Sequence, residues 1–270
     1  MRRLLHISDL HFGAEDGLAL RAVERFAEQQ AIDALIVSGD LTQKGRPGEF
    51  AAAAAWLGRF SVPVVVTPGN HDTSLLNLYS RAVRPFARYA RHTAPVAVEA
   101  LRFPDLWIAT INTARGVQLR RNWALGAVNS RQLEELAAAF APAPRNALRA
   151  LVCHHPLIGP PESPLRGSTR GGVAAAEALA AMGVDLVLSG HLHVPFVLPL
   201  QPGDGRTWSI GAGTLSERRR GWHASFTLLH LTADGGTSEA IVIDPEGQDT
   251  RTEKRDLEFR PRGTPNIAAR

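Results

Sequence analysis

Short apolar runs alternate with segments of helical periodicity along the first seventy residues of the chain. Residues 4–8, 32–38 and 62–67 are mostly apolar runs of strand length. Between them, residues 18–30 carry apolar side chains at helical spacing, and Pro47 before an alanine-rich stretch is typical of a helix start. Strands that alternate with helices predict parallel pairing in a layered α/β fold.

The pattern continues less regularly through the rest of the chain. Residues 74–95 have mixed helical character directly after the third strand, which predicts a small insertion that could cover a site. Next we expect a strand pair at 96–103 and 106–112, a helix at 131–140 behind an Asn129/Gln132 capping box, a strand at 147–153, a helix at 173–182 and a strand at 184–189. The last apolar runs predict antiparallel strands in the second half of the sheet, at 195–200, 208–212, 224–231 and 238–243.

The length of the chain allows one large domain or two small ones, and we expect one domain over residues 1–245. Within it, residues 156–172 are rich in proline and glycine, which predicts an ordered loop or lid. Residues 246–270 carry charge and proline with little apolar content. We therefore expect a mobile C-terminal tail there.

Polar side chains of a few kinds follow five of the predicted strands. In α/β folds ligands bind at the carboxyl ends of the strands, so a site is expected where these side chains lie. Six of the ten histidines belong to this set. The motifs are Asp9-x-His11, Gly39-Asp40, Gly69-Asn70-His71-Asp72, His154-His155 and Gly190-His191-x-His193.

The donor atoms of these motifs suit metal ions. Oxygen and nitrogen ligands without thiolate favour manganese, iron, zinc or nickel over a structural zinc cage. Seven or eight such groups exceed the needs of one tetrahedral ion and fit two ions about 3.5–4 Å apart that share a carboxylate. Asp40, in the middle of the set, is the natural bridge. His154 and His155 are adjacent, so on a strand only one of them can be a ligand.

The five motifs, in this order from residue 9 to residue 193, resemble the calcineurin-like metallophosphoesterase superfamily. The helical insertion and the His-His-Pro motif are most similar to small bacterial members related to class III cyclic-nucleotide phosphodiesterases. The resemblance implies a four-layer α/β/β/α sandwich of two mixed sheets flanked by helices. It also implies that His71 lies near the leaving-group oxygen, and that His155 is a supporting or substrate-facing group. The implied ligands are Asp9, His11, Asp40 and His193 for one metal, and Asp40, Asn70, His154 and His191 for the other.

The expected function is a metal-dependent phosphodiesterase acting on a small phosphodiester such as a 3',5'-cyclic nucleotide. Two manganese or iron ions, or zinc in their place, would activate a water to hydroxide for in-line attack. His71 would donate a proton to the departing oxygen, and Asp72 would hold the His71 ring in one tautomer or serve as a turn cap. The alternatives are a glycerophosphodiesterase, a phosphomonoesterase, a lipid-precursor pyrophosphatase and a nuclease. A non-catalytic scaffold is disfavoured because none of the ligand positions is lost.

Composition adds little that is specific. The net charge of +4 is mild, so nucleic acid is not the favoured partner, and Arg218–Arg220 is expected to be a solvated loop although it could contact a substrate phosphate. His6 is expected to be structural and Cys153, the only cysteine, a buried hydrophobe. The chain has no signal-peptide core and no membrane-length apolar window, so a cytoplasmic location without a membrane partner is expected. The oligomeric state stays open, with a homodimer among the alternatives.

Overall fold

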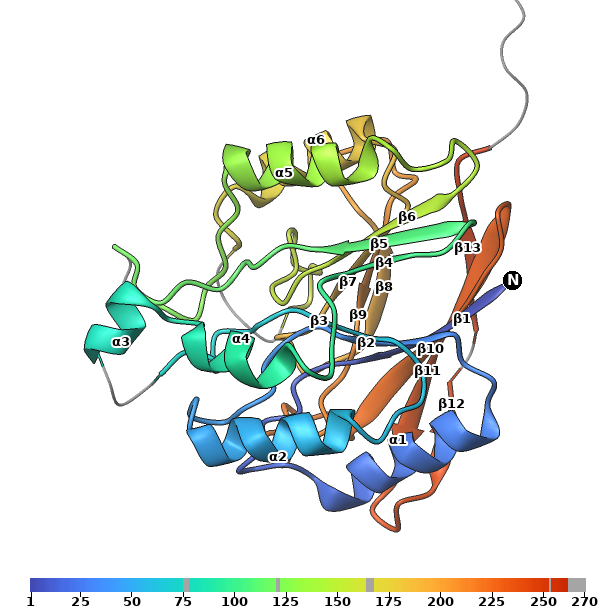
Figure 1. Cartoon of the computed structure of the whole chain (residues 1–270). Coiled ribbons are helices and arrows are strands. Elements are labelled where there is room, and N and C mark those ends of the chain that lie inside the picture. Colours follow the sequence, from blue (N-terminus) through green and yellow to red (C-terminus); the bar gives the residue numbers. More distant parts are fainter. Residues whose placement is uncertain (75–77, 120–121, 164–167, 253, 262–270) are drawn as a thin grey trace, which may run out of the picture.

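Two β-sheets lie face to face, with helices on both outer sides (Figure 1). The protein is described by a computed structural model over residues 1–74, 78–119, 122–163, 168–252 and 254–261. The four-layer α/β/β/α sandwich expected from the sequence is confirmed. Within the described part of the chain, none of the helices combines the length and the apolar character needed to span a bilayer.

The first sheet has the strand order β12-β11-β10-β1-β2-β3, with β13 also paired to β11. Its strands β1, β2 and β3 run parallel, as the alternating pattern predicts, whereas β10 is antiparallel to β1. The strands are β1 (Arg2–Ile7), β2 (Ala34–Val37), β3 (Val64–Val66), β10 (Ser225–Leu231), β11 (Gly235–Ile243), β12 (Asp249–Arg251) and β13 (Arg255–Glu258).

The second sheet has the order β4-β5-β6-β7-β9-β8. Its central strands β5, β6, β7 and β9 are parallel, and the two outer strands are antiparallel to their neighbours. The strands are β4 (Ala100–Arg102), β5 (Leu106–Thr110), β6 (Leu148–Val152), β7 (Leu186–Ser189), β8 (Phe196–Pro199) and β9 (Trp208–Gly211).

The described helices cover the outer faces and form the insertion. Helices α1 (Gly17–Gln29) and α2 (Pro47–Leu57) pack on the first sheet, and α5 (Ser130–Phe140) and α6 (Gly172–Ala181) pack on the second. The expected capping box opens α5, since Asn129 accepts a hydrogen bond from the backbone N–H of Gln132. The predicted insertion contains two short helices, α3 (Leu78–Val83) and α4 (Ala87–Thr93).

Two expectations about the C-terminal third were wrong. The run at 208–212 was expected to be antiparallel, but β9 lies parallel to β7, with Leu188 opposite Ile210. The expected mobile tail holds β12 and β13, which pair with β11 through backbone hydrogen bonds, and Leu257 and Phe259 in that segment are buried. Backbone pairing of this kind leaves no mark in the hydrophobic pattern. The last part of the expected tail, residues 262–270, lies outside the described residues.

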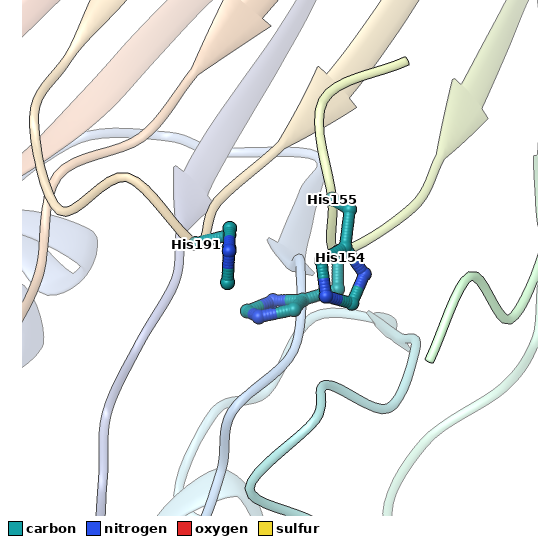
Figure 2. A group of neighbouring side chains, drawn as sticks. All are labelled: His154, His155 and His191. Carbon is teal, nitrogen blue, oxygen red and sulfur yellow. The ribbon is translucent and has the colours of Figure 1, made fainter. Parts of the chain in front are cut away.

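The parallel strands bring the sequence motifs to one edge of the sandwich. Each of β1, β2, β3, β6 and β7 is followed within six residues by one of the five motifs. The loops after β6 and β7 thereby bring three histidines together, as Figure 2 shows for His154, His155 and His191.

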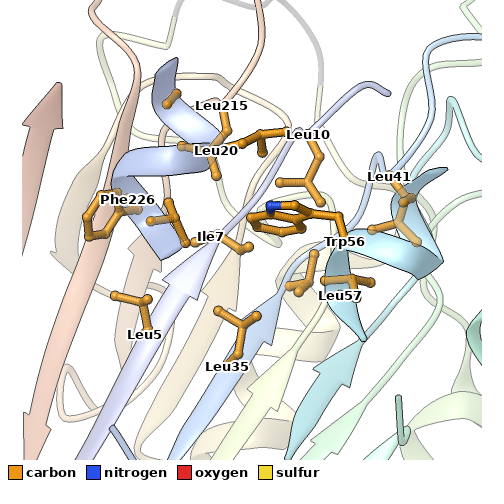
Figure 3. Packing of buried hydrophobic residues seen from close by; sticks show 14 of the residues in the cluster. Leu5, Ile7, Leu10, Leu20, Leu35, Leu41, Trp56, Leu57, Leu215 and Phe226 are labelled. Carbon is orange, nitrogen blue, oxygen red and sulfur yellow. The ribbon is translucent and has the colours of Figure 1, made fainter. Parts of the chain in front are cut away.

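Three apolar cores hold this edge in place. One core lies between the two sheets and includes Leu4, Ile36 and Ile108. Another fills the space between the first sheet and α1/α2, where Trp56 packs among Leu5, Leu35 and other buried side chains (Figure 3). The third joins the second sheet to α5 and α6. Because β2 and β3 are buried along their whole length, they are apolar throughout instead of alternating.

Candidate metal centre

The backbone of the motif loops is held in an unusual conformation. Among the described residues, the non-glycine residues with a positive φ are Asp9, His11, Asp40, His191 and His193, with φ between 47° and 69°. Every one of them is a predicted site residue. A left-handed conformation is costly for a residue with a side chain, by about 1–3 kcal/mol, and persists only where the surroundings enforce it. These loops are therefore built to aim side chains at one point.

Backbone hydrogen bonds tie the loop after β1 to the loop after β2. The N–H of Asp9 donates to the carbonyl of Gly39 at 3.0 Å, and the N–H of His11 donates to the carbonyl of Asp40 at 3.0 Å. Two glycines of the motifs allow the loops to approach this closely. A Cβ at Gly69 would collide with the Asp40 carboxylate, and one at Gly190 would collide with Ser8.

A first cluster joins Asp9, His11 and His193, all of which are buried. The Nε2 atoms of the two histidines lie 3.3 Å apart. Asp9 Oδ1 lies 3.0 Å from Nε2 of His193 and 3.6 Å from Nε2 of His11, and makes no hydrogen bond that satisfies it within the described structure. Its other oxygen accepts bonds from the Ser8 hydroxyl and the His191 N–H. A buried carboxylate oxygen that faces two imidazole nitrogens is a suitable position for a cation.

Asp40 lies between this cluster and the remaining ligand candidates. Its Oδ2 atom is 3.7 Å from Nε2 of His11 and 3.3 Å from Nε2 of His154. Its Oδ1 atom accepts a hydrogen bond from the backbone N–H of His71 at 2.8 Å. The same carboxylate therefore reaches donors from both sheets.

The second cluster contains His154, His155 and His191 (Figure 2). His154 directs Nε2 toward the centre, 3.2 Å from Oδ1 of Asn70. Both ring nitrogens of His155 have partners: Nε2 donates to the carbonyl of Ala124, and Nδ1 lies 2.8 Å from the Thr113 hydroxyl. His154 thus differs from His155 in that its Nε2 faces Asn70 and Asp40, which are themselves ligand candidates.

Backbone carbonyls fix the orientation of two of the imidazoles. Nδ1 of His154 donates to the carbonyl of Ser38 at 2.7 Å, and Nδ1 of His193 donates to the carbonyl of Arg218 at 2.5 Å. Because a carbonyl can only accept, each ring carries its proton on Nδ1 and leaves Nε2 free for an ion. This arrangement is typical of histidines that ligate metals.

Charges within the cluster displace several pKa values. Burial alone would lower the pKa of His154, but the nearby Asp40 carboxylate raises it to about 9. Burial would raise the pKa of Asp40, yet the surrounding histidines, His154 first, hold it far below its usual range. Burial lowers the pKa of His191 to about 3. The carboxylates therefore stay ionised, and a cation would replace the protons that the imidazoles share with them.

His71 and Asp72 do not pair as expected. Nδ1 of His71 donates to the carbonyl of Gln43 at 2.8 Å, so this carbonyl, and not Asp72, sets the tautomer of the ring. Asp72 instead accepts bonds from the N–H groups of Leu41, Thr42 and Gly69 and from the Thr42 hydroxyl. Burial, followed by the charge of Asp40, raises the pKa of Asp72 to about 6. Its contacts are those of a turn cap, the other role that the sequence left open.

Residues 212–224 form the loop between β9 and β10, which we call the arginine loop, and they contribute to the site although Arg218–Arg220 was expected to be a solvated loop. Since β9 is parallel to β7, this loop emerges at the same edge as the motifs. The Thr214 hydroxyl donates to the carbonyl of Asp9 at 2.8 Å. Nη1 of Arg218 lies 2.8 Å from Nε2 of His71. The run Arg218–Arg220 was the sequence signal for this part of the site. Because the strand before it was expected to be antiparallel, nothing placed that run at this edge.

The sequence matches the calcineurin-like phosphoesterase family over residues 2–195, which is more than half of the chain. The chain therefore belongs to this family, as the five motifs indicated. Members of the family use a dinuclear metal centre. The aspartate and histidine clusters described above fit such a centre in donor type and in burial.

Two curated relatives are phosphodiesterases by name. The glycerophosphodiester phosphodiesterase GpdQ of Enterobacter lignolyticus is 34% identical over 80 residues, which are 26% of this chain and 29% of that protein. The chain thus spans less than a third of that relative. A probable cyclic nucleotide phosphodiesterase of Synechococcus sp. is 26% identical over 257 residues, or 88% of this chain and 91% of the relative.

Solved structures share the fold at lower identity. A purple acid phosphatase from yellow lupin seeds aligns with a TM-score of 0.69 and 14% identity, covering 99% of this chain and 57% of that one. The protein TT1561 of Thermus thermophilus aligns with a TM-score of 0.59 and 18% identity, covering 84% of this chain and 93% of that one. At such identities the likeness shows the fold alone.

Proposed function

We propose that the protein is a dinuclear metal-dependent phosphodiesterase that hydrolyses small phosphodiesters, with 3',5'-cyclic nucleotides as the first candidates. The observation that carries the proposal is the position of Asp40 Oδ2, within 3.7 Å of His11 Nε2 and 3.3 Å of His154 Nε2. A single carboxylate between two separate sets of nitrogen donors is what a bridged pair of ions requires.

We assign the ligands accordingly. The first ion would be held by the first cluster together with the bridging carboxylate, and the second by the bridging carboxylate, the Asn70 amide oxygen and two histidines. His155 is left out because both of its ring nitrogens are occupied. The complete set is Asp9, His11, Asp40 and His193 for the first ion, and Asp40, Asn70, His154 and His191 for the second.

Two divalent cations in these positions would supply a water of lowered pKa and compensate the negative charge of the phosphoryl oxygens. The chain supplies the remaining groups. Asp40 and Asp9 remain ionised because the neighbouring histidines hold their pKa values low. Since Nδ1 of His71 donates to the Gln43 carbonyl, the proton that can pass to a departing oxygen is one carried on Nε2. His71 is therefore the proposed proton donor, and Asp72 holds the loop that presents it.

Support for a diester comes from the two phosphodiesterase-named relatives. A small pocket lies beside His191. Residues 125 and 126, together with Ser163 and Thr169 of the 156–172 loop, line it. This pocket is the place where we expect that loop to shape specificity.

The test is a substrate panel on metal-analysed protein. Bis(p-nitrophenyl) phosphate should be hydrolysed when Mn²⁺ is added, and cyclic nucleotides, glycerophosphodiesters and p-nitrophenyl phosphate rank the substrate classes. DNA and RNA in the same panel, read at several salt concentrations, separate a nuclease, whose binding falls steeply with salt. Absence of turnover with every divalent metal, together with no metal retained on purification, would favour the non-catalytic scaffold.

A further inference from the structure

The arginine loop is fastened to the metal centre from both sides. The Thr214 hydroxyl and the Leu215 N–H both donate to the carbonyl of Asp9, at 2.8 and 3.3 Å. In the other direction, Nδ1 of His193 donates to the carbonyl of Arg218. Two proposed ligand loops thus define where the loop runs, and the side chains at 218 and 220 start from fixed positions.

Arg218 occupies the position opposite the proposed proton donor. Because Nδ1 of His71 donates to the Gln43 carbonyl, Nε2 of the neutral ring is an acceptor, and Nη1 of Arg218 donates to it at 2.8 Å. His71 could therefore carry a proton on Nε2 for a leaving group only when Arg218 turns from it to the phosphate. The oxygen of the Gln43 side chain is 3.5 Å from the same Nη1. One nitrogen of the guanidinium is thus accounted for. Arginine carries five N–H donors in a rigid fork, so further donors remain for an anion.

Arg220 has a donor that nothing in the described chain satisfies. Its side chain is half-buried, and its Nη1 atom is fully buried without a hydrogen-bond partner among the described residues. Burial lowers the pKa of Arg220, and the charges that act on it are Asp9, Arg218 and Asp40, in that order. A buried guanidinium N–H without an acceptor is costly. Arg220 thus feels the charges of Asp9 and Asp40 and has a buried N–H for which the described residues provide no acceptor.

Arg219, between them, behaves differently. It is exposed, and its Nη2 atom pairs with Oδ2 of Asp16, the N-cap of α1, at 2.5 Å. Along the loop, Arg219 thus reaches out to α1, whereas Arg218 contacts His71 and Arg220 is half-buried. Two like charges that face one site repel each other, and an anion between them would remove that repulsion.

We infer that Arg218 and Arg220 form an anion clamp that binds the non-bridging oxygens of the substrate phosphate. This inference rests on the proposed function for the identity of the substrate, but not for the binding of phosphate. Guanidinium forks match phosphoryl oxygens in geometry and stay charged at neutral pH. In this clamp the two arginines bind the ester. The groups that would hold the ions are left to activate the water.

The test uses inorganic phosphate as the probe and the Mn²⁺-loaded full chain as the protein. Arg218→Gln and Arg220→Gln should each raise the Kd for phosphate, measured by isothermal titration calorimetry, on the order of 10-fold or more, as expected for loss of a charge-assisted hydrogen bond. The KM for bis(p-nitrophenyl) phosphate should rise in parallel. Arg219→Gln is the matched control on the same loop and should leave both constants unchanged. Metal content and melting temperature, measured on all variants, report on folding.

The outcomes separate the two hypotheses. If only the 218 and 220 variants bind phosphate more weakly, and their metal content is unchanged, the clamp is supported. This holds even if no ester is hydrolysed. In that case the proposed function fails and the clamp does not. Equal phosphate affinity in all three variants and the wild type would overturn the clamp. So would a loss of metal in Arg218→Gln or Arg220→Gln, because the arginines would then serve the structure of the centre. Arg218→Lys should restore part of the affinity through its charge.

Discussion

The ion-facing motif loops and the arginine loop contribute to the same site but are held in different ways. The ion-facing side chains Asp9, His11, Asp40 and His193 are buried, and each has a left-handed backbone conformation. Arg218 and Arg220 are half-buried and lie on a single loop. The side of the site that would hold ions is thus fixed by its backbone, whereas the arginine side chains reach the site from one loop.

This difference suggests that the motif loops bind metal and that the arginine loop binds substrate. Strained backbone and carbonyl-fixed imidazoles keep ligand atoms at fixed separations, which a pair of ions requires. Long arginine side chains can instead follow a phosphate through a reaction. Changes on the ion-facing side should therefore remove metals and all activity together, whereas changes on the arginine side should weaken substrate binding alone.

The largest effect is expected at the bridge. Asp40→Ala should remove both ions at once, because the same carboxylate oxygen faces His11 and His154. We expect a loss of activity beyond the roughly 10–100-fold that removal of a supporting group costs. Metal content per chain, measured by inductively coupled plasma mass spectrometry, is the readout. Retention of one full equivalent would show that Asp40 serves only one ion.

The next comparison is between adjacent histidines. His154→Ala should abolish binding of the second ion, whereas His155→Gln should lower metal affinity by about 10–100-fold at most, because the ring nitrogens of His155 are engaged by Thr113 and Ala124. Metal titrations of both variants provide the measurement. If His155→Gln proved the more damaging of the two, the ligand assignment would have to be reversed.

A smaller, purely kinetic effect is expected at His71. His71→Ala should lower kcat by roughly 10²–10⁴-fold, the usual contribution of a general acid, while both ions stay bound. Steady-state kinetics combined with metal analysis test this prediction. If the variant lost metal, His71 would have to be counted among the ligands. Its position allows this, because the ligand atoms of His11, Asp40 and His71 lie within 4.8 Å of one another.

The smallest effect concerns stability beneath the site. His6 is fully buried on β1, its Nε2 lies 2.9 Å from the Ser38 hydroxyl, and burial lowers its pKa from 6.5 to about 3. Below pH 6.5 His6 therefore takes up a proton in the unfolded chain but stays neutral in the folded protein. This contribution to stability is complete above pH 6.5 and is lost as the pH falls below it, by about 1.4 kcal/mol per pH unit.

His6→Gln keeps a polar partner for Ser38 and removes the titration. Its stability should therefore depend less steeply on pH than that of the wild type between about pH 7 and about pH 5. Urea unfolding of both metal-free proteins would reveal the difference in slope. Parallel curves over that range would show that His6 is not neutral in the folded state, or that it already titrates abnormally in the unfolded chain.

Much of the fold and of the ion-facing side could be predicted because the signals are local. Asp9 and His191 stand directly after apolar runs, and parallel strands bring such positions to one edge. The direction of β9 could not be predicted, since a four-residue strand has the same pattern in either orientation. That single uncertainty concealed Arg218. Likewise the sequence of β12 is polar, and its place in the sheet depends on backbone hydrogen bonds, which the side-chain pattern does not reveal.

The role of His155 was open for a similar reason. Its partners, Thr113 and Ala124, border a stretch without hydrophobic periodicity, so no pattern could bring them beside it. The tautomer of His71 depends on the carbonyl of Gln43, a backbone group that the sequence does not single out. Hydrogen bonds to loop backbone thus set the fine geometry here, and they become visible only in three dimensions.

The most direct test of the account is the number of ions in the wild-type centre. Crystals grown with Mn²⁺ and measured at the manganese absorption edge should show two anomalous peaks about 3.5–4 Å apart on either side of the Asp40 carboxylate. A single peak near Asp9 and His193, or no peak at this edge of the sandwich, would contradict the dinuclear centre on which the proposed chemistry depends.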